Sequence, residues 1–176
     1  MALAVKVKLA QTVATRDPQK TEAMLSEMQS DAQSALENLR DLARGIYPPL
    51  LADQGLPAAL RAQARKVPVP VTVEAASIGR YPQEAEAAVY FCCLEALQNV
   101  AKYADASSVS VNLDIEDGQL NFEISDDGRG FDSATTPLGS GIQNMADRLA
   151  ALGGSIEVQS IPGRGTSVRG HIPVSP

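Results

Sequence analysis

Residues 120–131 read Leu-Asn-Phe-Glu-Ile-Ser-Asp-Asp-Gly-Arg-Gly-Phe, an alternating apolar run that ends in two acidic residues and a glycine loop. The alternation from Leu120 to Ile124 predicts a β-strand with one buried face. A second alternating run lies upstream, between Val109 and Ile115, and Asp117-Gly118 separates the two runs. Two such runs around Asp-Gly predict a β-hairpin.

Helices and a second hairpin are predicted on either side of this hairpin. Residues 82–104 form a long predicted helix that opens with a proline, and residues 141–152 form another that ends at Gly153-Gly154. Alternating apolar residues between 156 and 172 predict another hairpin around a Pro-Gly-Arg-Gly turn. Helices and hairpins mixed in this way, without repeated βαβ units, indicate an α+β sandwich.

The first 48 residues carry a regular apolar repeat. From Leu25 to Ile46, apolar residues recur at alternating spacings of three and four, which is typical of a helical bundle or coiled coil. Asp17-Pro18 predicts the start of this helix, and the prolines after Tyr47 predict its end. An ordinary amphipathic helix on a globular core is the alternative. The regularity favours helix pairing, between chains as well as within one. A proline-rich connector follows, with a short predicted helix around residues 56–65.

Composition excludes several classes of function. The 176 residues fit one large domain or two small ones. Fifteen Lys and Arg against 21 Asp and Glu leave a net charge of −6, which argues against binding to duplex DNA or an anionic membrane. A single histidine, His171, excludes a multi-histidine metal site and weakens any Ser-His-Asp or Cys-His interpretation. No run reaches about 18 apolar residues, and Cys92-Cys93 fits two buried thiols, so we expect a soluble, cytoplasmic chain.

Three Gly-x-Gly elements provide the first sign of ligand chemistry. They are Gly128/Gly130, Gly139/Gly141 and Gly163/Gly165, and none fits a Walker-type phosphate loop or a Rossmann fingerprint. Asp126 ends an apolar strand directly before the first pair. A carboxylate there can accept a hydrogen bond from an exocyclic amine, while glycine lets the backbone approach a flat ring. The second pair precedes a helix, whose free N–H groups and positive dipole end suit a phosphate.

The long predicted helix supplies three more candidate residues. At about 100° per residue, Glu95, Asn99 and Lys102 fall within roughly 60° of each other at the edge of the apolar face. Oxygen ligands close to an ammonium suit a magnesium-bound polyphosphate, because Mg²⁺ prefers oxygen and Lys neutralises phosphate charge. A solvated polar stripe with an intrahelical charge pair is the alternative. The nearby glycine loops favour the nucleotide interpretation.

Four stretches together resemble the motifs of the GHKL ATPases, which have the Bergerat fold. Residues 95–104, Glu-Ala-Leu-Gln-Asn-Val-Ala-Lys-Tyr-Ala, look like the N-box, and residues 126–131 resemble the D-x-G-x-G box. Residues 139–145 resemble the second glycine box, and residues 163–166 resemble the closing G-x-G-T motif. The four follow each other in the family's order across residues 82–174, which makes the match specific.

A second likeness lies upstream. Residues 39–48, Leu-Arg-Asp-Leu-Ala-Arg-Gly-Ile-Tyr-Pro, and the leucines that follow resemble the dimerisation helix and linker of sensor histidine kinases. The subfamily is the one that pairs with LuxR-type response regulators. The resemblance implies a partial dimerisation helical hairpin over residues 1–48, a linker over 49–70 and an ATP-binding catalytic domain over 71–176. That domain would have a mixed, mainly antiparallel sheet. The implied partners are a second copy of the chain, through the N-terminal helices, and a LuxR-type regulator, with no direct contact to nucleic acid.

The resemblance also implies ATP with Mg²⁺ and assigns roles by motif position. Asn99 would be the metal ligand. Two catalytic residues are implied, Lys102 as a phosphate contact and Glu95 as the group that polarises water or the metal's shell. Asp126 would read the adenine amine, helped by the hydroxyl of Thr166. The other nucleotide contacts would be glycines, with Gly128 and Gly130 beside the base and sugar and Gly139 and Gly141 beside the phosphates.

One departure concerns the phosphate acceptor. Kinases of this kind phosphorylate a histidine on the first helix of the hairpin, and residues 1–15 contain none. We therefore expect a fragment that binds ATP but does not phosphorylate itself, with the histidine and the regulator aspartate phosphorylated only in the full protein. A GHKL serine kinase or anti-sigma factor is one alternative, although it would not need the heptad hairpin. A non-catalytic dimerisation module is another, and the intact Asn99 and Asp126 speak against it.

Overall fold

The computed structural model describes residues 17, 20–22, 24–26, 28, 48–75, 78–132, 136 and 139–174. The chain divides into two compact units, Met1–Ile46 and Tyr47–Pro176. In the first unit, the backbone N–H of Lys20 donates to Asp17 Oδ1 at 3.0 Å, which confirms Asp17 as a helix cap. Most of the predicted heptad repeat lies outside the described residues.

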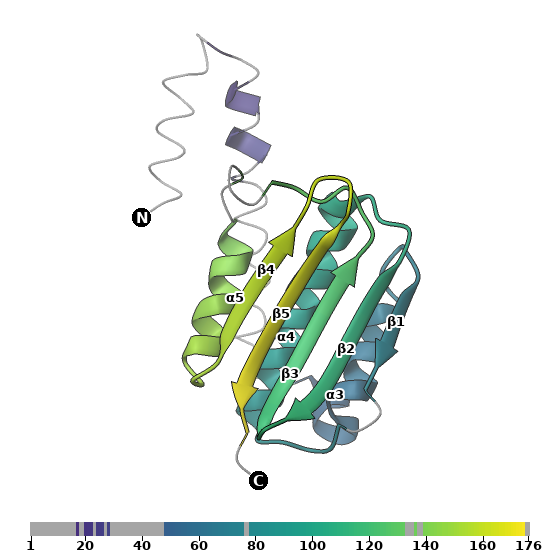
Figure 1. Ribbon diagram of the computed structural model, residues 1–176, viewed down its shortest axis with the longest axis vertical. Helices are drawn as coiled ribbons and strands as arrows, with labels where there is room; N and C mark the ends of the chain where they lie inside the picture. The colour runs from purple at the N-terminus through teal and green to yellow at the C-terminus, as the bar shows by residue number, and fades with distance from the viewer. Residues whose placement is uncertain are drawn as a thin grey trace. The chain divides into compact units, whose positions relative to one another are not determined.

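The second unit is built around a five-stranded sheet with the order β1-β2-β3-β5-β4 (Figure 1). Strand β1 is parallel to β2, and every other neighbouring pair is antiparallel. This confirms the predicted α+β class and the mixed, mainly antiparallel sheet. The elements in chain order are α3 (Pro49–Ala64), β1 (Val71–Glu74), α4 (Gln83–Asn99), the π-helix η1 (Val100–Ala104), β2 (Val109–Glu116), β3 (Gln119–Asp126), α5 (Ser140–Ala150), β4 (Ser155–Ser160) and β5 (Thr166–Pro173).

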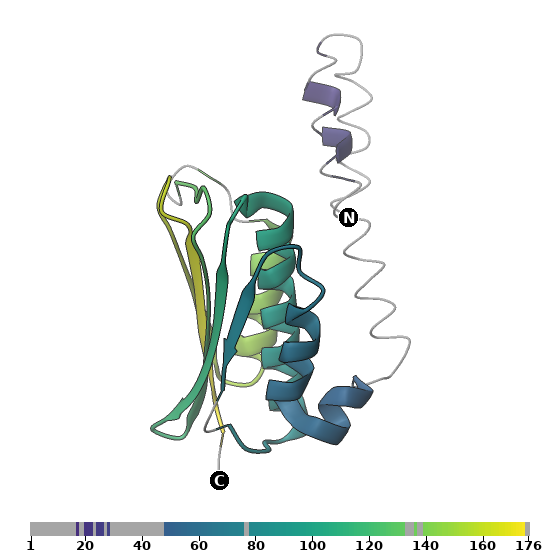
Figure 2. The ribbon, with the colours of Figure 1, turned by 90° about the vertical axis from the view of Figure 1, so that its right-hand side faces the viewer.

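The helices of this unit all cover one face of the sheet, as Figure 2 shows. The alternation that predicted β3 explains this two-layer arrangement, because every second side chain of a strand points to the same face. Leu120, Phe122 and Ile124 are buried under α4, while the residues between them are partly exposed on the open face. His171 belongs to that open face of β5, and its Nδ1 lies 3.4 Å from Ser155 Oγ.

Helix α3 corrects one sequence prediction. The expected short helix around residues 56–65 begins instead at Pro49, and its Leu51, Leu56 and Leu60 are fully buried in the core. Prolines are tolerated there because the first turn of a helix has free N–H groups. Gly55 has a φ of 76°, which lets two helical segments join at a kink. The proline-rich stretch therefore contributes to the core rather than only connecting two domains.

A buried carboxylate fastens α3 to the start of α4. Arg80 Nε donates to Glu86 Oε1 at 3.0 Å, and Arg80 Nη2 lies 3.5 Å from the carbonyl oxygen of Leu51. Glu86 is fully buried, so this ion pair holds one charge away from water. Throughout the parts of the chain that the structure describes, no helix is long and apolar enough to span a membrane.

Candidate functional site

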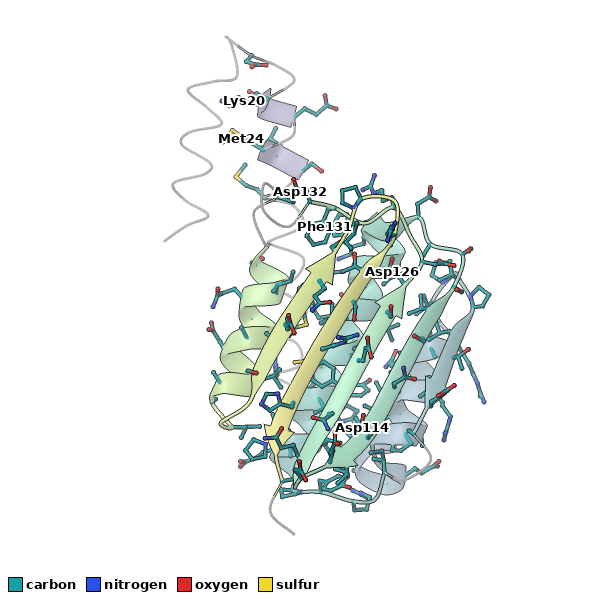
Figure 3. All side chains as sticks on the ribbon, in the orientation of Figure 1. Lys20, Met24, Asp114, Asp126, Phe131 and Asp132 are labelled. Atoms are coloured by element: carbon teal, nitrogen blue, oxygen red, sulfur yellow. The ribbon has the colours of Figure 1, made fainter. Side chains whose placement is uncertain are left out.

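Asp126 ends strand β3 and is 8% exposed. Its Oδ1 accepts a hydrogen bond from the backbone N–H of Gly128 at 2.9 Å. Burial raises the pKa of Asp126, whereas hydrogen bonds from the backbone of Gly128 and Thr166 oppose the rise and the charge of Asp127 adds to it. A carboxylate has about four acceptor positions, so Asp126 keeps acceptor capacity for a ligand. Figure 3 shows Asp126 and Phe131 near the same end of the sheet.

The glycine loop after Asp126 packs directly on the end of the long helix. The N–H of Arg129 donates to the carbonyl of Ala104 at 2.7 Å, and a Cβ on Gly128 would collide with the same carbonyl. Ala104 is the last residue of η1, which follows directly on Asn99 at the end of α4. The structure therefore joins the helix that carries Asn99 and Lys102 to the loop of Asp126.

The winding of this helix differs from the expectation. A regular step of about 100° per residue places Lys102 beside Glu95. The structure instead changes to π-helical winding at Val100, with hydrogen bonds from i to i+5, so the regular step does not hold beyond Asn99. Lys102 is exposed in this π-helix, whereas Glu95 and Asn99 are partly buried.

Gly130 and Gly165 meet where the two glycine loops cross. Both have a positive φ, 57° and 81° respectively. A Cβ on Gly130 would collide with the carbonyl of Ile161, and a Cβ on Gly165 would collide with the carbonyl of Asp126. Packing of backbone against backbone therefore already requires glycine at both positions. The contact of Gly128 and Gly130 with base and sugar stays a prediction.

The second glycine box lies at the N-terminus of α5. Gly139 is the N-cap and is exposed, with open space where a Cβ would be. A Cβ on Gly141 would collide with the carboxylate of Glu95. Glu95 therefore reaches from α4 to the first turn of α5, which carries the positive end of the helix dipole. The structure brings Glu95 and the second glycine box together, although they are far apart in the sequence.

Sequence reasoning missed the residue that holds the turn after η1 in place. Both oxygens of Asp127 accept hydrogen bonds from Ser107 and Ser108. The backbone N–H groups lie 2.8 and 2.9 Å from Oδ1, and the two hydroxyls lie 2.7 and 2.9 Å from Oδ2. These hydrogen bonds hold the pKa of Asp127 well below its usual range. The adjacent serines and the second aspartate were visible in the sequence, but nothing there joined residues 20 positions apart.

We expect Asp127→Asn to destabilise the fold at neutral pH, because an amide offers one acceptor oxygen where the carboxylate offers two. A carboxyl group whose pKa is lowered in the folded state stabilises that state at pH values above the pKa that the group has in the unfolded chain. That stabilisation is lost as the pH falls through the folded pKa. The difference between the variant and the unmutated chain should therefore be largest near pH 7 and shrink in acid. Urea unfolding at pH 7 and pH 3 measures it.

Asp114→Asn is the matched control for this prediction. Asp114 lies toward the opposite end of the sheet (Figure 3) and accepts a side-chain hydrogen bond from Asn121 at 2.7 Å. Its replacement should leave the urea midpoint nearly unchanged at both pH values. Equal midpoints for Asp127→Asn and Asp114→Asn at pH 7 would contradict the role given to Asp127.

The cysteines do not form part of a reactive site. Cys92 and Cys93 are free and buried in α4. Burial raises the pKa of Cys92 to about 12, partly offset by the charge of Arg148, and burial also raises the pKa of Cys93. Both thiols are therefore protonated at neutral pH and are poor nucleophiles. This confirms the prediction of two buried thiols.

Comparison with known families identifies this arrangement. Residues 84–176 match the family described as histidine kinase-, DNA gyrase B-, and HSP90-like ATPases. The chain belongs to this ATPase family. Residues 1–51 match a second family, described as histidine kinase. The two matches confirm the resemblance found in the sequence, with a histidine-kinase region followed by an ATPase domain.

Two curated sensor histidine kinases are similar to most of this chain. The oxygen sensor histidine kinase NreB of Staphylococcus carnosus is 30% identical over 147 residues, which cover 80% of this chain and 42% of NreB. The sensor histidine kinase MctS of Rhizobium johnstonii is 31% identical over 150 residues, which cover 80% of this chain and 32% of MctS. The ATPase chain thus spans less than half the length of either relative.

Solved structures show the same fold. The blue-light activated histidine kinase of Erythrobacter litoralis EL346 is 26% identical, with a TM-score of 0.60 over 68% of this chain and 42% of that one. The histidine kinase domain of the same protein matches 97% of this chain and 95% of that chain, with a TM-score of 0.57 at 19% identity. At this low identity, the second match supports only the fold of the ATPase chain and says nothing of its function.

Proposed function

We propose that this chain is the dimerisation and catalytic region of a sensor histidine kinase that binds ATP with Mg²⁺. In the full protein, the γ-phosphoryl group would pass to a histidine and then to an aspartate of a LuxR-type regulator. One observation carries the proposal: the carboxylate of Asp126 is held at the end of β3 by the glycine loop that follows it. A partly desolvated acceptor beside a closely packed loop suits the amino edge of adenine.

The other residues would serve the phosphates and the metal. Asn99 and Glu95 offer oxygen donors from one helix, which fits the preference of Mg²⁺ for oxygen ligands shared with substrate phosphates. Magnesium, when bound, would neutralise charge on the β- and γ-phosphates. The ammonium of Lys102 would add positive charge at the same phosphates, and the N–H groups that open α5 would face them near Gly139 and Gly141.

The chemistry asked of this site is mostly positioning. Phosphoryl transfer needs the attacking atom in line with the leaving oxygen and the developing charge neutralised. Asp126 would fix the base and α5 would fix the phosphates, so the nucleotide would be held at both ends. Glu95, which lies beside Gly141, would orient the metal's water shell or the attacking group.

A second copy of the chain would pair through the N-terminal helices. Leu25 begins the heptad repeat and is 53% exposed in the single chain, which leaves an apolar side chain for a partner helix to cover. The regulator would dock on this dimer, and the cytoplasm would be the compartment that supplies both ATP and regulator.

Nucleotide titration and transfer in trans test the proposal. The chain should bind ATP more tightly with Mg²⁺ than without it, as measured by calorimetry. Addition of a peptide that carries the upstream histidine helix should give phosphate that is stable in base and lost in acid. No ATP binding would refute the proposal, whereas acid-stable phosphate would favour a GHKL serine kinase.

A further inference from the structure

Three polar residues form a row across the sheet at the end where Asp126 lies. The strand register pairs Thr166 with Asp126 on one side and with Ser160 on the other. All three belong to the face that packs against the helices, because Ile124 and Val168, two residues away on their strands, are buried. The row therefore borders the proposed base pocket.

The hydroxyl of Ser160 lies within hydrogen-bond distance of three groups. Ser160 is 9% exposed. Its Oγ accepts from the backbone N–H of Phe131 at 2.8 Å and donates to the carbonyl of Gly165 at 3.2 Å. The same Oγ lies 2.9 Å from Oγ1 of Thr166, where either hydroxyl could be the donor.

Counting hydrogens decides which hydroxyl donates. A serine hydroxyl has one hydrogen and two lone pairs. If Ser160 gives its hydrogen to Gly165, it accepts from both Phe131 and Thr166, and all three contacts are satisfied. The reverse assignment places Ser160 Oγ and the carbonyl oxygen of Gly165 3.2 Å apart with no hydrogen between them, and it leaves that carbonyl only the longer bond from the N–H of Ile161, at 3.3 Å. Thr166 then has its only hydrogen turned toward Ser160, and it offers a ligand its lone pairs alone.

An edge built in this way accepts hydrogen bonds but does not donate them. The ionised carboxylate of Asp126 is also an acceptor only. Two acceptors side by side can take the two hydrogens of a 6-amino group, one each, whereas both repel a carbonyl oxygen at that position of the purine. We infer that Ser160, acting through Thr166, is a positioning residue that makes the base pocket select a 6-amino over a 6-oxo purine. The inference rests on the proposed ATP site.

Ser160 also ties Phe131 to β4, so a loss of order in the loop must be told apart from a change of selectivity. A looser loop would weaken the binding of both purines alike. A changed donor pattern would alter the ratio of their affinities. The informative quantity is therefore the ratio of the Kd for inosine triphosphate to the Kd for ATP.

The test measures both Kd values by calorimetry on the whole chain. Ser160→Ala frees the hydrogen of Thr166, which can then be donated to a 6-oxo group, so the ratio should fall about tenfold. Thr166→Val keeps the side-chain shape but removes one acceptor, and it should lower the ratio by a similar factor. The double variant should lose no more than either single one, because both act through one hydrogen bond. Ser155→Ala, at the exposed start of β4, is the matched control and should keep the ratio.

The outcomes separate this inference from the function on which it rests. An unmutated chain that does not bind ATP overturns the proposed function itself. An unmutated chain that prefers ATP, with an unchanged ratio in Ser160→Ala and Thr166→Val, overturns only the role of Ser160. Should Ser160→Ala fail to fold, Thr166→Val decides, because it leaves the bonds of Ser160 to Phe131 and Gly165 in place.

Discussion

Replacement of Asp126 with asparagine is expected to weaken ATP binding by roughly 10- to 100-fold, the usual cost of losing a hydrogen bond to a charged group. The carboxylate offers acceptors both to the N–H of Gly128 and to an adenine amine. In asparagine one oxygen becomes an amide donor, which would face the donating amine of the base. Calorimetric titration with ATP and Mg²⁺ measures the loss.

The same substitution should not weaken the fold at neutral pH. Burial raises the pKa of Asp126 in the folded state. The contribution of this carboxyl group to stability is therefore present at pH values below its pKa in the unfolded chain, and it is lost as the pH rises through its pKa in the folded chain. Asparagine stays neutral and avoids that penalty. Thermal unfolding without nucleotide at pH 7 should give a midpoint no lower than that of the unmutated chain.

Asp127→Asn is the matched comparison for this result, because the two aspartates are neighbours with opposite pKa shifts. It should lower the unfolding midpoint at pH 7, where Asp126→Asn does not. If Asp126→Asn keeps full ATP affinity, Asp126 does not read the base. If both variants unfold at the same lower temperature, the result contradicts the prediction that the two carboxylates affect stability in opposite directions.

Gly165→Ala is expected to destabilise the second unit strongly. Its φ of 81° alone costs about 1–2 kcal/mol for an alanine. A Cβ there would also collide with the backbone carbonyl of Asp126, which cannot move without shifting the end of β3. Forced overpacking adds about 1–3 kcal/mol. We therefore expect a loss of roughly 2–5 kcal/mol in the free energy of unfolding, measured by urea denaturation.

Gly163→Ala measures the backbone strain without the collision, so comparison with Gly165→Ala separates the two contributions. Gly163 belongs to the same turn and has a φ of 75°, but no atom lies within 4 Å of its Cβ position. Its replacement should cost only the strain, about 1–2 kcal/mol. Similar losses for the two variants would mean that contact with Asp126 does not explain the glycine at position 165.

Local patterns were sufficient to predict most elements of the second unit. Alternating apolar residues around Asp117-Gly118 predicted the β2–β3 hairpin. The structure pairs the two strands along their whole length, from Val109 opposite Asp126 to Glu116 opposite Gln119. The period of two is a property of any strand with one buried face, so it can be read without the fold. Helix α3 was predicted too short, because prolines at its start look like a connector until packing buries the leucines around them.

The family, the order of its motifs and the candidate residues could be read from the sequence, because each motif is a short run of neighbouring residues. Which of those residues meet depends on the tertiary structure. It joined Glu95 to Gly141, tied Asp127 to two serines, and set Ser160 beside Thr166 through strand pairing. These contacts depend on strand register and helix winding, and the π-helical turn after Asn99 changes the direction in which later side chains point. Such geometry is set by packing across the whole domain, and no local run of residues encodes it.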